Sequence, residues 1–236
     1  MVLTSRNIER IMSPNSGDTA THTRKKRRLD LDSFDDIVDI FVGPSRHHFQ
    51  MHKDLLCNVS TYFPAALNGY LKEAQEQKIE FLEDSVEVFK YFRYWLYSQT
   101  LLMTTEAEND IEWRTLIDIF IFGDMRSIPR LQNAAIDGMI EKQATDAHNP
   151  LEEVRYIYEN TIEKSPLRSL FVNFTHTIVH FNHRDWADGW LIEEKYELFP
   201  KRFLFDVAVA YCRKVSHLAG GIGSFKDNRW RYHVKY

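Results

Sequence analysis

Residues 36–63 read DIVDIFVGPSRHHFQMHKDLLCNVSTYF, and this stretch decides the fold. Its first apolar run, residues 37–42, is β-branched and aromatic with one aspartate inside it, which is typical of a strand buried on most of its surface. Residues 43–46 have the length of a hairpin turn, and residues 49–52 alternate apolar and polar side chains like a second strand. Asp54 can cap a helix whose apolar residues recur at helical spacing, namely Leu55, Leu56, Val59 and Phe63. The stretch therefore predicts a strand, a turn, a strand and one helix.

A second block, residues 79–97, predicts a short strand followed by a long helix. Residues 79–82 are the strand candidate, and the polar residues 72–78 before them indicate a connector. Asp84 or Ser85 can cap the helix. Apolar side chains crowd several of its faces: Val86, Val88, Phe89, Tyr91, Phe92, Tyr94, Trp95, Leu96 and Tyr97. Such a helix is buried on several sides or faces a partner, and packing in the core is the default interpretation.

A third block, residues 111–131, is ambiguous when read by composition. The β-branched density of residues 116–122 would by itself favour a strand over a helix. Pro129 fits the first turn of a further helix, because proline lacks an N–H that the first turn does not use. The apolar seam of that helix consists of Leu131, Ala134, Ala135 and Met139.

The order and spacing of these blocks resemble a BTB/POZ domain. The resemblance rests on residues 36–63, on FKYFRYWLY at residues 89–97, and on GDMRSIPRL at residues 123–131 followed by two alanines. The blocks stand in the family's order and cover roughly residues 34–144. The resemblance implies an α+β fold in which helices surround a short sheet, and it implies that residues 111–125 are helical.

The chain divides into three parts. Residues 1–33 lack sustained apolar periodicity and are expected to be a disordered, basic N-terminal segment. Residues 34–147 form the BTB/POZ-like domain, and residues 148–236 are predicted to be a helical C-terminal extension. The extension has three helical seams, in residues 151–158, 165–181 and 200–211, and the third consists of Phe203, Leu204, Val207, Ala208 and Tyr211. Because undocked seams would expose large apolar surfaces to water, we expect the extension to pack on the first domain.

Composition indicates a folded, soluble protein. Of the 236 residues 44% are hydrophobic and 14% aromatic, and the formal net charge is −4. No apolar run approaches the roughly 18 residues that span a bilayer, and the N-terminal region is polar and then basic, so we expect neither membrane insertion nor a signal peptide. Cys57 and Cys212 lie far apart without a CxxC spacing, which indicates reduced thiols and neither a disulfide framework nor a cysteine-based zinc site.

The one dense positive block is Arg24, Lys25, Lys26, Arg27 and Arg28. It can be a nuclear-import signal, a nucleic-acid contact or a solvated run of charges in a linker. Direct nucleic-acid binding is disfavoured, because no aromatic side chain interleaves with the cations to read bases. We expect the protein in the nucleus, the cytoplasm or both.

A histidine cluster is the strongest candidate for chemistry. His176, His180 and His183 follow a spacing of i, i+4 and i+7, which places them on the helix face opposite the apolar seam, as metal ligands could be. The glutamate of the His-Glu-x-x-His motif is replaced by Thr177, and no general base lies between the histidines. Structural or solvated histidines are therefore favoured over the alternative of a metal-dependent enzyme. We expect no enzyme activity, no metal and no cofactor.

The resemblance implies protein–protein interaction as the function. BTB/POZ domains commonly form homodimers; many bring substrates to cullin-type ubiquitin ligases, and others serve transcriptional regulators. We therefore expect an adaptor or scaffold, with a nuclear transcription-associated regulator as the alternative. Members that dock on cullins use the helix ending in Trp-Leu-Tyr and the loop after it. The corresponding residues here are Tyr94, Trp95, Tyr97, Met103, Glu106 and Glu108.

Overall fold

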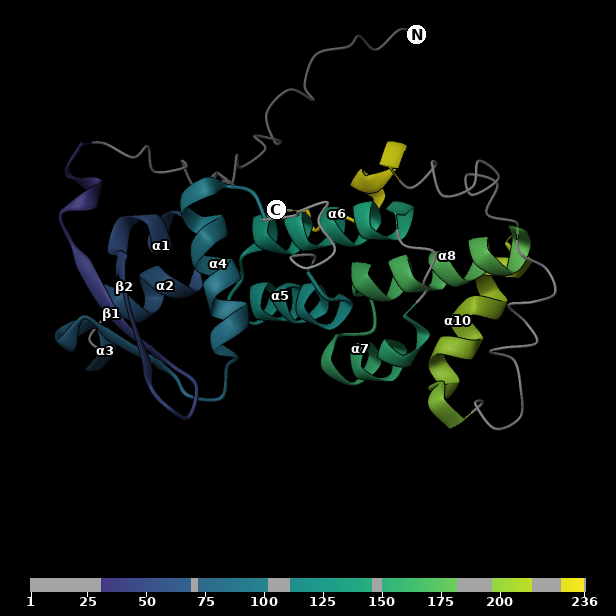
Figure 1. Ribbon diagram of the computed structural model, residues 1–236, viewed down its shortest axis with the longest axis horizontal. Helices are drawn as coiled ribbons and strands as arrows, with labels where there is room; N and C mark the ends of the chain where they lie inside the picture. Colours follow the sequence, from purple (N-terminus) through teal and green to yellow (C-terminus); the bar gives the residue numbers. More distant parts are fainter. Residues whose placement is uncertain are drawn as a thin grey trace, which may run out of the picture.

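The computed structural model describes residues 31–68, 72–101, 111–145, 150–181, 197–213 and 226–235. A three-stranded sheet lies with helices α1 to α4 at one end of the molecule, α5 and α6 lie in the middle, and α7, α8 and α10 lie at the other end (Figure 1). This arrangement confirms the predicted α+β class with a helical extension. Within the described ranges, none of the helices combines the length and the apolar character that crossing a membrane requires.

The sheet is built around β1 (Ile37–Val42), which lies between β2 (His47–His52) and β3 (Lys78–Phe81). β1 pairs antiparallel with β2, which places Ile40 opposite Phe49, and parallel with β3. Both of these side chains are buried. The two strands of the hairpin and the third strand are therefore confirmed, and β2 and β3 form the two edges of the sheet.

The hairpin turn depends on Gly43. Its φ of 73° lies in the left-handed region, which side chains other than glycine rarely adopt. A Cβ at this position would also lie 3.0 Å from a methyl carbon of Val86. The N–H of Gly43 donates to the carbonyl of Phe81 over 2.9 Å, which ties the turn to the end of β3.

The prediction of one helix after the hairpin is wrong, because the chain forms α1 (Lys53–Val59) and α2 (Tyr62–Leu67). Ser60 between them is extended, with φ −140° and ψ 155°. Its hydroxyl accepts a hydrogen bond from the N–H of Tyr62 and donates one to the carbonyl of Arg126. These bonds offer the backbone an alternative to the helix ladder, and the apolar spacing gives no sign of them.

The region before α4 also differs from the prediction. Residues 72–76 form the short helix α3 (Lys72–Glu76) in place of a connector. α4 (Val86–Ser98) begins at Ser85, whose hydroxyl accepts a hydrogen bond from the N–H of Val88 over 3.4 Å, so the predicted cap is confirmed. The buried residues of α4 are Val88, Phe89, Phe92, Trp95 and Leu96.

α5 (Trp113–Met125) and α6 (Pro129–Thr145) are helices, as the family resemblance implies. Most of α5 is buried, and its β-branched density therefore reflects a helix covered on several sides. A Cβ at Gly123 would lie 2.9 Å from Cγ of Gln132 on α6. The two helices pack this closely because Gly123 has no side chain.

A buried ion pair joins the hinge between α5 and α6 to the turn before α4. Arg126 pairs with Asp84, and both side chains are largely buried. The guanidinium carbon of Arg126 also lies 4.4 Å from the ring centroid of Phe81 and 4.1 Å from that of Phe122. Burial raises the pKa of Asp84 and lowers the pKa of Arg126. Loss of hydration therefore outweighs the mutual attraction of the pair, as is common for buried ion pairs.

Replacing Asp84 by alanine is expected to lower the free energy of unfolding by about 3–5 kcal/mol, because Arg126 would stay buried without its counter-charge. Glu80→Ala is the matched control. Glu80 pairs with Arg46 at 2.7 Å and with Lys78 at 2.6 Å on a partly exposed edge of the sheet, so its loss should lower the free energy of unfolding much less, because water screens exposed ion pairs. Denaturant unfolding followed by circular dichroism measures both changes. Equal losses of unfolding free energy in the two variants would contradict the larger contribution of the buried pair.

The three helices predicted after the first domain are confirmed within the described residues. They are α7 (Val154–Asn160), which follows a 3-10 turn at Leu151–Glu153, α8 (Pro166–Phe181) and α10 (Lys201–Cys212). The predicted seam of α10 is wrong in part. Phe203 and Ala210 are buried, whereas Leu204 and Tyr211 are exposed.

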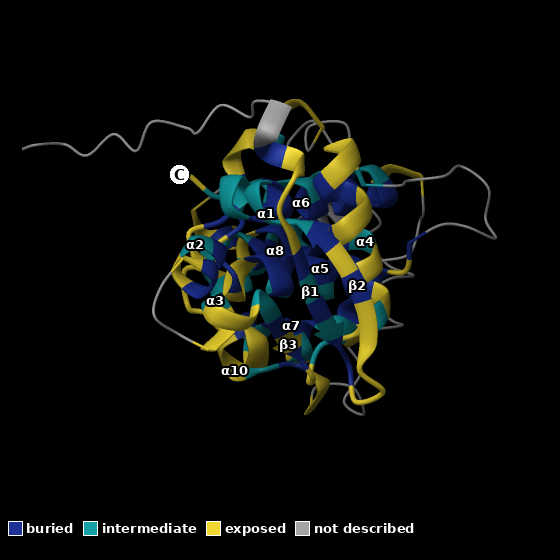
Figure 2. Cartoon of the chain, turned by 90° about the vertical axis from the view of Figure 1, so that its left-hand side faces the viewer, coloured by how far each residue is buried: buried dark blue, intermediate teal, exposed yellow. Residues whose placement is uncertain are grey.

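The extension packs on α5, as predicted, and the buried residues of both parts, which are dark blue in Figure 2, belong to one hydrophobic core. The ring centroid of Trp113 lies 6.2 Å from those of Phe171 and Phe174 on α8, with the rings edge to face. The hydroxyl of Tyr156 donates to a carboxylate oxygen of Asp118 over 2.7 Å. One face of α5 is thus covered by α7 and α8.

A chain that ends after residue 147 is therefore expected to aggregate. Its free energy of unfolding should be several kcal/mol lower than that of the full chain. The truncation would expose Trp113 and the neighbouring apolar face of α5, and each Å² of apolar surface contributes about 25 cal/mol. Sedimentation measures aggregation, and thermal unfolding measures stability. A truncated chain that is monodisperse and as stable as the full chain would contradict a single cooperative unit.

Candidate protein-interaction surface

The outer face of α4 carries Lys90, Arg93, Tyr94 and Tyr97. Positions i, i+3, i+4 and i+7 share one face of a helix, so these side chains project from the same stripe. Tyr94 is 44% exposed and Tyr97 47% exposed. The opposite face of α4 is buried in the core, which fixes the position of the exposed stripe.

A cleft of about 610 Å³ lies between this stripe and β2. The guanidinium carbon of Arg93 lies 5.3 Å from the ring centroid of Phe49, which is buried. The cleft therefore offers an apolar base beneath a polar rim. Its described lining consists of His47, Phe49, Lys90, Arg93, Tyr94, Tyr97 and Ser98.

Tyr97 is held in place by His52 at the end of β2. The tyrosine hydroxyl lies 2.8 Å from Nδ1 of His52 and accepts a hydrogen bond from the N–H of the same residue over 3.3 Å. The exposed ring of Phe34 meets the imidazole of His52 edge to face, with the centroids 5.4 Å apart. The aromatic surface therefore continues from α4 across the end of the hairpin.

The structure places the predicted partner-binding residues in different environments. Tyr94 and Tyr97 lie on the exposed stripe. Trp95 is 1% exposed and packs in the core, so its assignment to a contact surface is corrected. Its ring centroid lies 6.4 Å from that of Phe92. Met103, Glu106 and Glu108 lie outside the described residues.

The charge of the cleft was missed by the sequence reasoning. Among its described lining residues Lys90, Arg93 and His47 can carry positive charge, and none is acidic. The sequence does carry a signal for this charged face. Residues 90, 93, 94 and 97 share one side of the helix, and the buried residues of α4 lie on the other side. Tyr94 and Tyr97 of this face were predicted from the sequence, but Lys90 and Arg93 were not.

The histidines that were considered as metal ligands belong to the C-terminal extension. The ring of His176 packs against that of Tyr211 on α10, with the centroids 4.4 Å apart, so this histidine belongs to a contact between two helices and does not project freely into solvent. The side chain of His180 and all of His183 lie outside the described residues, as do Arg24 to Arg28. Within the part of the chain that the structure describes, three or more potential metal ligands do not come together.

A second cleft, of about 650 Å³, lies where the sheet, α5 and α7 meet. Its lining includes the buried pair of Asp84 and Arg126 and the hydrogen bond from Tyr156 to Asp118. Burial, and then the hydrogen bond to Asp118, raise the pKa of Tyr156 to about 12. Asp84 is paired with Arg126 and Asp118 with Tyr156, so these contacts serve the junction between the two parts of the fold.

Comparison with known proteins agrees with this geometry. Residues 30–142 match the family model described as BTB/POZ domain. The match extends from the residues before β1 into α6 and leaves α7, α8, α10 and residues 226–235 outside it. No curated protein matches the chain at significant similarity. BTB domains are generally protein–protein interaction modules and are typically not enzymes. Residues 30–142 therefore form a BTB/POZ domain, which the helices of the extension follow.

Proposed function

We propose that the chain is an adaptor or scaffold that binds a protein partner through the outer stripe of α4. The observation that carries the proposal is the pair of exposed tyrosines, Tyr94 and Tyr97, at the rim of a cleft with an apolar base. Tyrosines are enriched among the residues that dominate binding energy, because they combine apolar area with a hydroxyl and lose little conformational freedom.

The chemistry of the cleft defines the partner that it fits. An apolar side chain of the partner would contact the exposed rings of Tyr94 and Tyr97, and acidic side chains would lie near Lys90 and Arg93. Opposite charges at the rim raise the association rate and select the partner. The best match is therefore a partner surface with an apolar anchor and an acidic border.

We further propose a cullin-type ubiquitin ligase as the partner class. BTB domains that dock on cullins use the helix that corresponds to α4 together with the loop after it. Here that loop contributes Met103, Glu106 and Glu108, which follow α4 directly in the sequence. The exposed tyrosines of α4 and the acidic loop would then contact the same partner, whose surface would carry acidic groups opposite Lys90 and Arg93 and basic groups opposite Glu106 and Glu108.

Titration of the purified full-length chain with a purified cullin N-terminal domain tests this proposal. Tyr94→Ala should weaken binding about 30-fold, because truncating an interface residue of this kind costs about 2 kcal/mol. Arg93→Glu, or Glu106→Lys with Glu108→Lys, should lower the association rate and its dependence on salt. Because homodimers are common in the family, sedimentation of the complex should determine how many copies of the chain bind each cullin domain.

Two substitutions away from α4 serve as controls. Met125 and Lys201 are exposed and lie outside the cleft. Met125→Ala and Lys201→Glu should leave both binding and stability nearly unchanged, because exposed substitutions change stability by less than about 0.5 kcal/mol. If the wild-type chain binds no cullin, the ligase role is wrong and a scaffold or regulator role becomes the better explanation.

The basic block supports a second proposal, on localisation. We propose that Arg24 to Arg28 direct nuclear import, since five consecutive cations can be bound by an import receptor. A fluorescent reporter fused to residues 1–33 should accumulate in the nucleus. The same reporter with glutamine at all five positions should be evenly distributed. An even distribution of the unchanged reporter would contradict import by this segment.

A further inference from the structure

Residues 226–235, called the tail segment below, lie along α6 and contact it over a large sequence separation (Figure 1). The contacts come from Asn133, Asp137 and Glu141, which follow one another at intervals of four residues. Such a spacing aligns them along one side of the helix over roughly 12 Å, at 1.5 Å per residue. The stripe lies outside the α4 surface and serves a separate purpose.

Asn133 binds the backbone of the tail segment. Its side-chain N–H donates to the carbonyl of Val234 over 3.2 Å, and its side-chain oxygen accepts from the N–H of the same residue over 2.6 Å. Both backbone groups of one residue are thus satisfied, as they would be beside a neighbouring strand. This contact is made to the backbone of Val234, just after the 3-10 turn at Arg229–Arg231, so it does not depend on the side chain at position 234.

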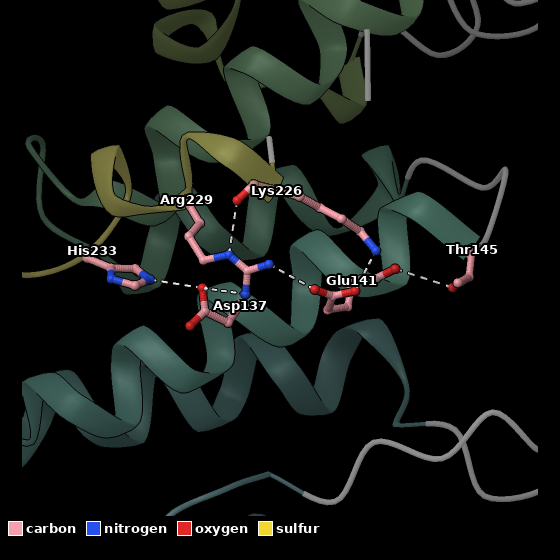
Figure 3. Close-up of polar contacts among 6 residues, drawn as sticks. All are labelled: Asp137, Glu141, Thr145, Lys226, Arg229 and His233. Atoms are coloured by element: carbon pink, nitrogen blue, oxygen red, sulfur yellow. Dashed lines mark hydrogen bonds and ion pairs between the residues drawn. The ribbon is translucent and has the colours of Figure 1, made fainter. Parts of the chain in front are cut away.

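Asp137 and Glu141 bind the basic side chains of the tail segment (Figure 3). Glu141 pairs with Lys226 at 2.6 Å and with Arg229 at 2.9 Å, while Asp137 lies 2.9 Å from Nε2 of His233. Hydrogen bonding to Lys226 lowers the pKa of Glu141. All of these side chains are partly exposed, so each ion pair is weak by itself and open to exchange.

One aromatic residue anchors the tail segment. Tyr232 is 3% exposed, and its hydroxyl accepts a hydrogen bond from the side chain of Asn173 on α8 over 3.1 Å. Trp230, two residues earlier, is 59% exposed. The tail segment therefore has one buried anchor between basic residues, which is how a short peptide is recognised by a folded surface.

We propose that this face, formed by Asn133, Asp137 and Glu141 with Asn173, is a peptide-binding site that the tail segment occupies in cis. The occupant in trans is a segment of a partner protein that carries basic residues around a tyrosine. Charge complementarity argues for this class, because both acidic residues of the stripe are paired with Arg229 of the tail, and Glu141 is also paired with Lys226. The site and the α4 surface would then bind different partners.

The tail segment competes with any such partner. A tethered segment acts at an effective concentration in the millimolar range, so a free peptide that makes the same contacts binds poorly to the intact chain. Weakening the tail segment in the full-length protein should expose the site. The probe is a fluorescein-labelled peptide of residues 226–236, KDNRWRYHVKY.

Fluorescence anisotropy of this peptide measures the opening of the site. The full-length Tyr232→Ala chain should bind the peptide at least about tenfold more tightly than the wild type, because its own tail competes less. A tenfold change in Kd corresponds to about 1.4 kcal/mol of binding free energy. Trp230→Ala is the matched control and should behave like the wild type, because this ring is exposed. Arg229→Ala provides a second way to open the site, and thermal unfolding shows that each chain is folded.

Substitutions in the site complete the test. Asn133→Ala, added to the Tyr232→Ala chain, should weaken peptide binding at least about tenfold, because both backbone hydrogen bonds are lost. A peptide with alanine for the tyrosine at position 232 should lose binding, and one with alanine for the tryptophan at position 230 should keep it. Binding that is absent from every folded chain, or insensitive to Asn133, would overturn the proposal. A wild-type dimer that becomes a monomer in the Arg229→Ala chain would also overturn it, since the occupant would then be the tail of a second copy.

Discussion

Burial of α5 on several sides is the constraint on which the rest of the structure depends. Near its end, Phe122 packs against the rings of the sheet and α4, and near its start Trp113 packs against α8. A polar side chain along such a helix is stabilised by a partner, because an unpaired buried polar group is costly. Tyr156 supplies one for the half-buried Asp118, and Glu153 pairs with the exposed Arg114. The extension is thus needed for the polar groups of α5 as well as for its apolar surface.

The same burial explains how the interaction surface is presented. Phe89 and Phe92 of α4 pack against Phe122, with ring centroids 6.0 Å and 5.1 Å apart, and this contact fixes the rotation of α4 about its axis. Tyr94 and Tyr97 must then point away from the core. A partner meets side chains already held in position, which reduces the conformational entropy lost on binding.

Regular periodicity made much of the fold predictable from the sequence. The hairpin, the capped helix at residues 86–98 and the helices of the extension all follow from alternation, spacing and caps, and the family resemblance decided that residues 113–125 are helical. Features that depend on single tertiary contacts were missed. The break at Ser60 needs the carbonyl of Arg126, and the burial of Trp95 needs the surrounding core. The contact between Asn133 and Val234 spans 101 residues, and no local pattern encodes it.

That long separation also has a consequence for the order in which the protein assembles during synthesis. Domains generally fold as the chain leaves the ribosome, N-terminal parts first. α5, α6 and α8 can therefore pack together before residues 226–235 have been made, and the stripe of Asn133, Asp137 and Glu141 stays bare until then. A nascent chain would present this acidic face to other molecules for a few seconds, at a synthesis rate of about 5–20 residues per second.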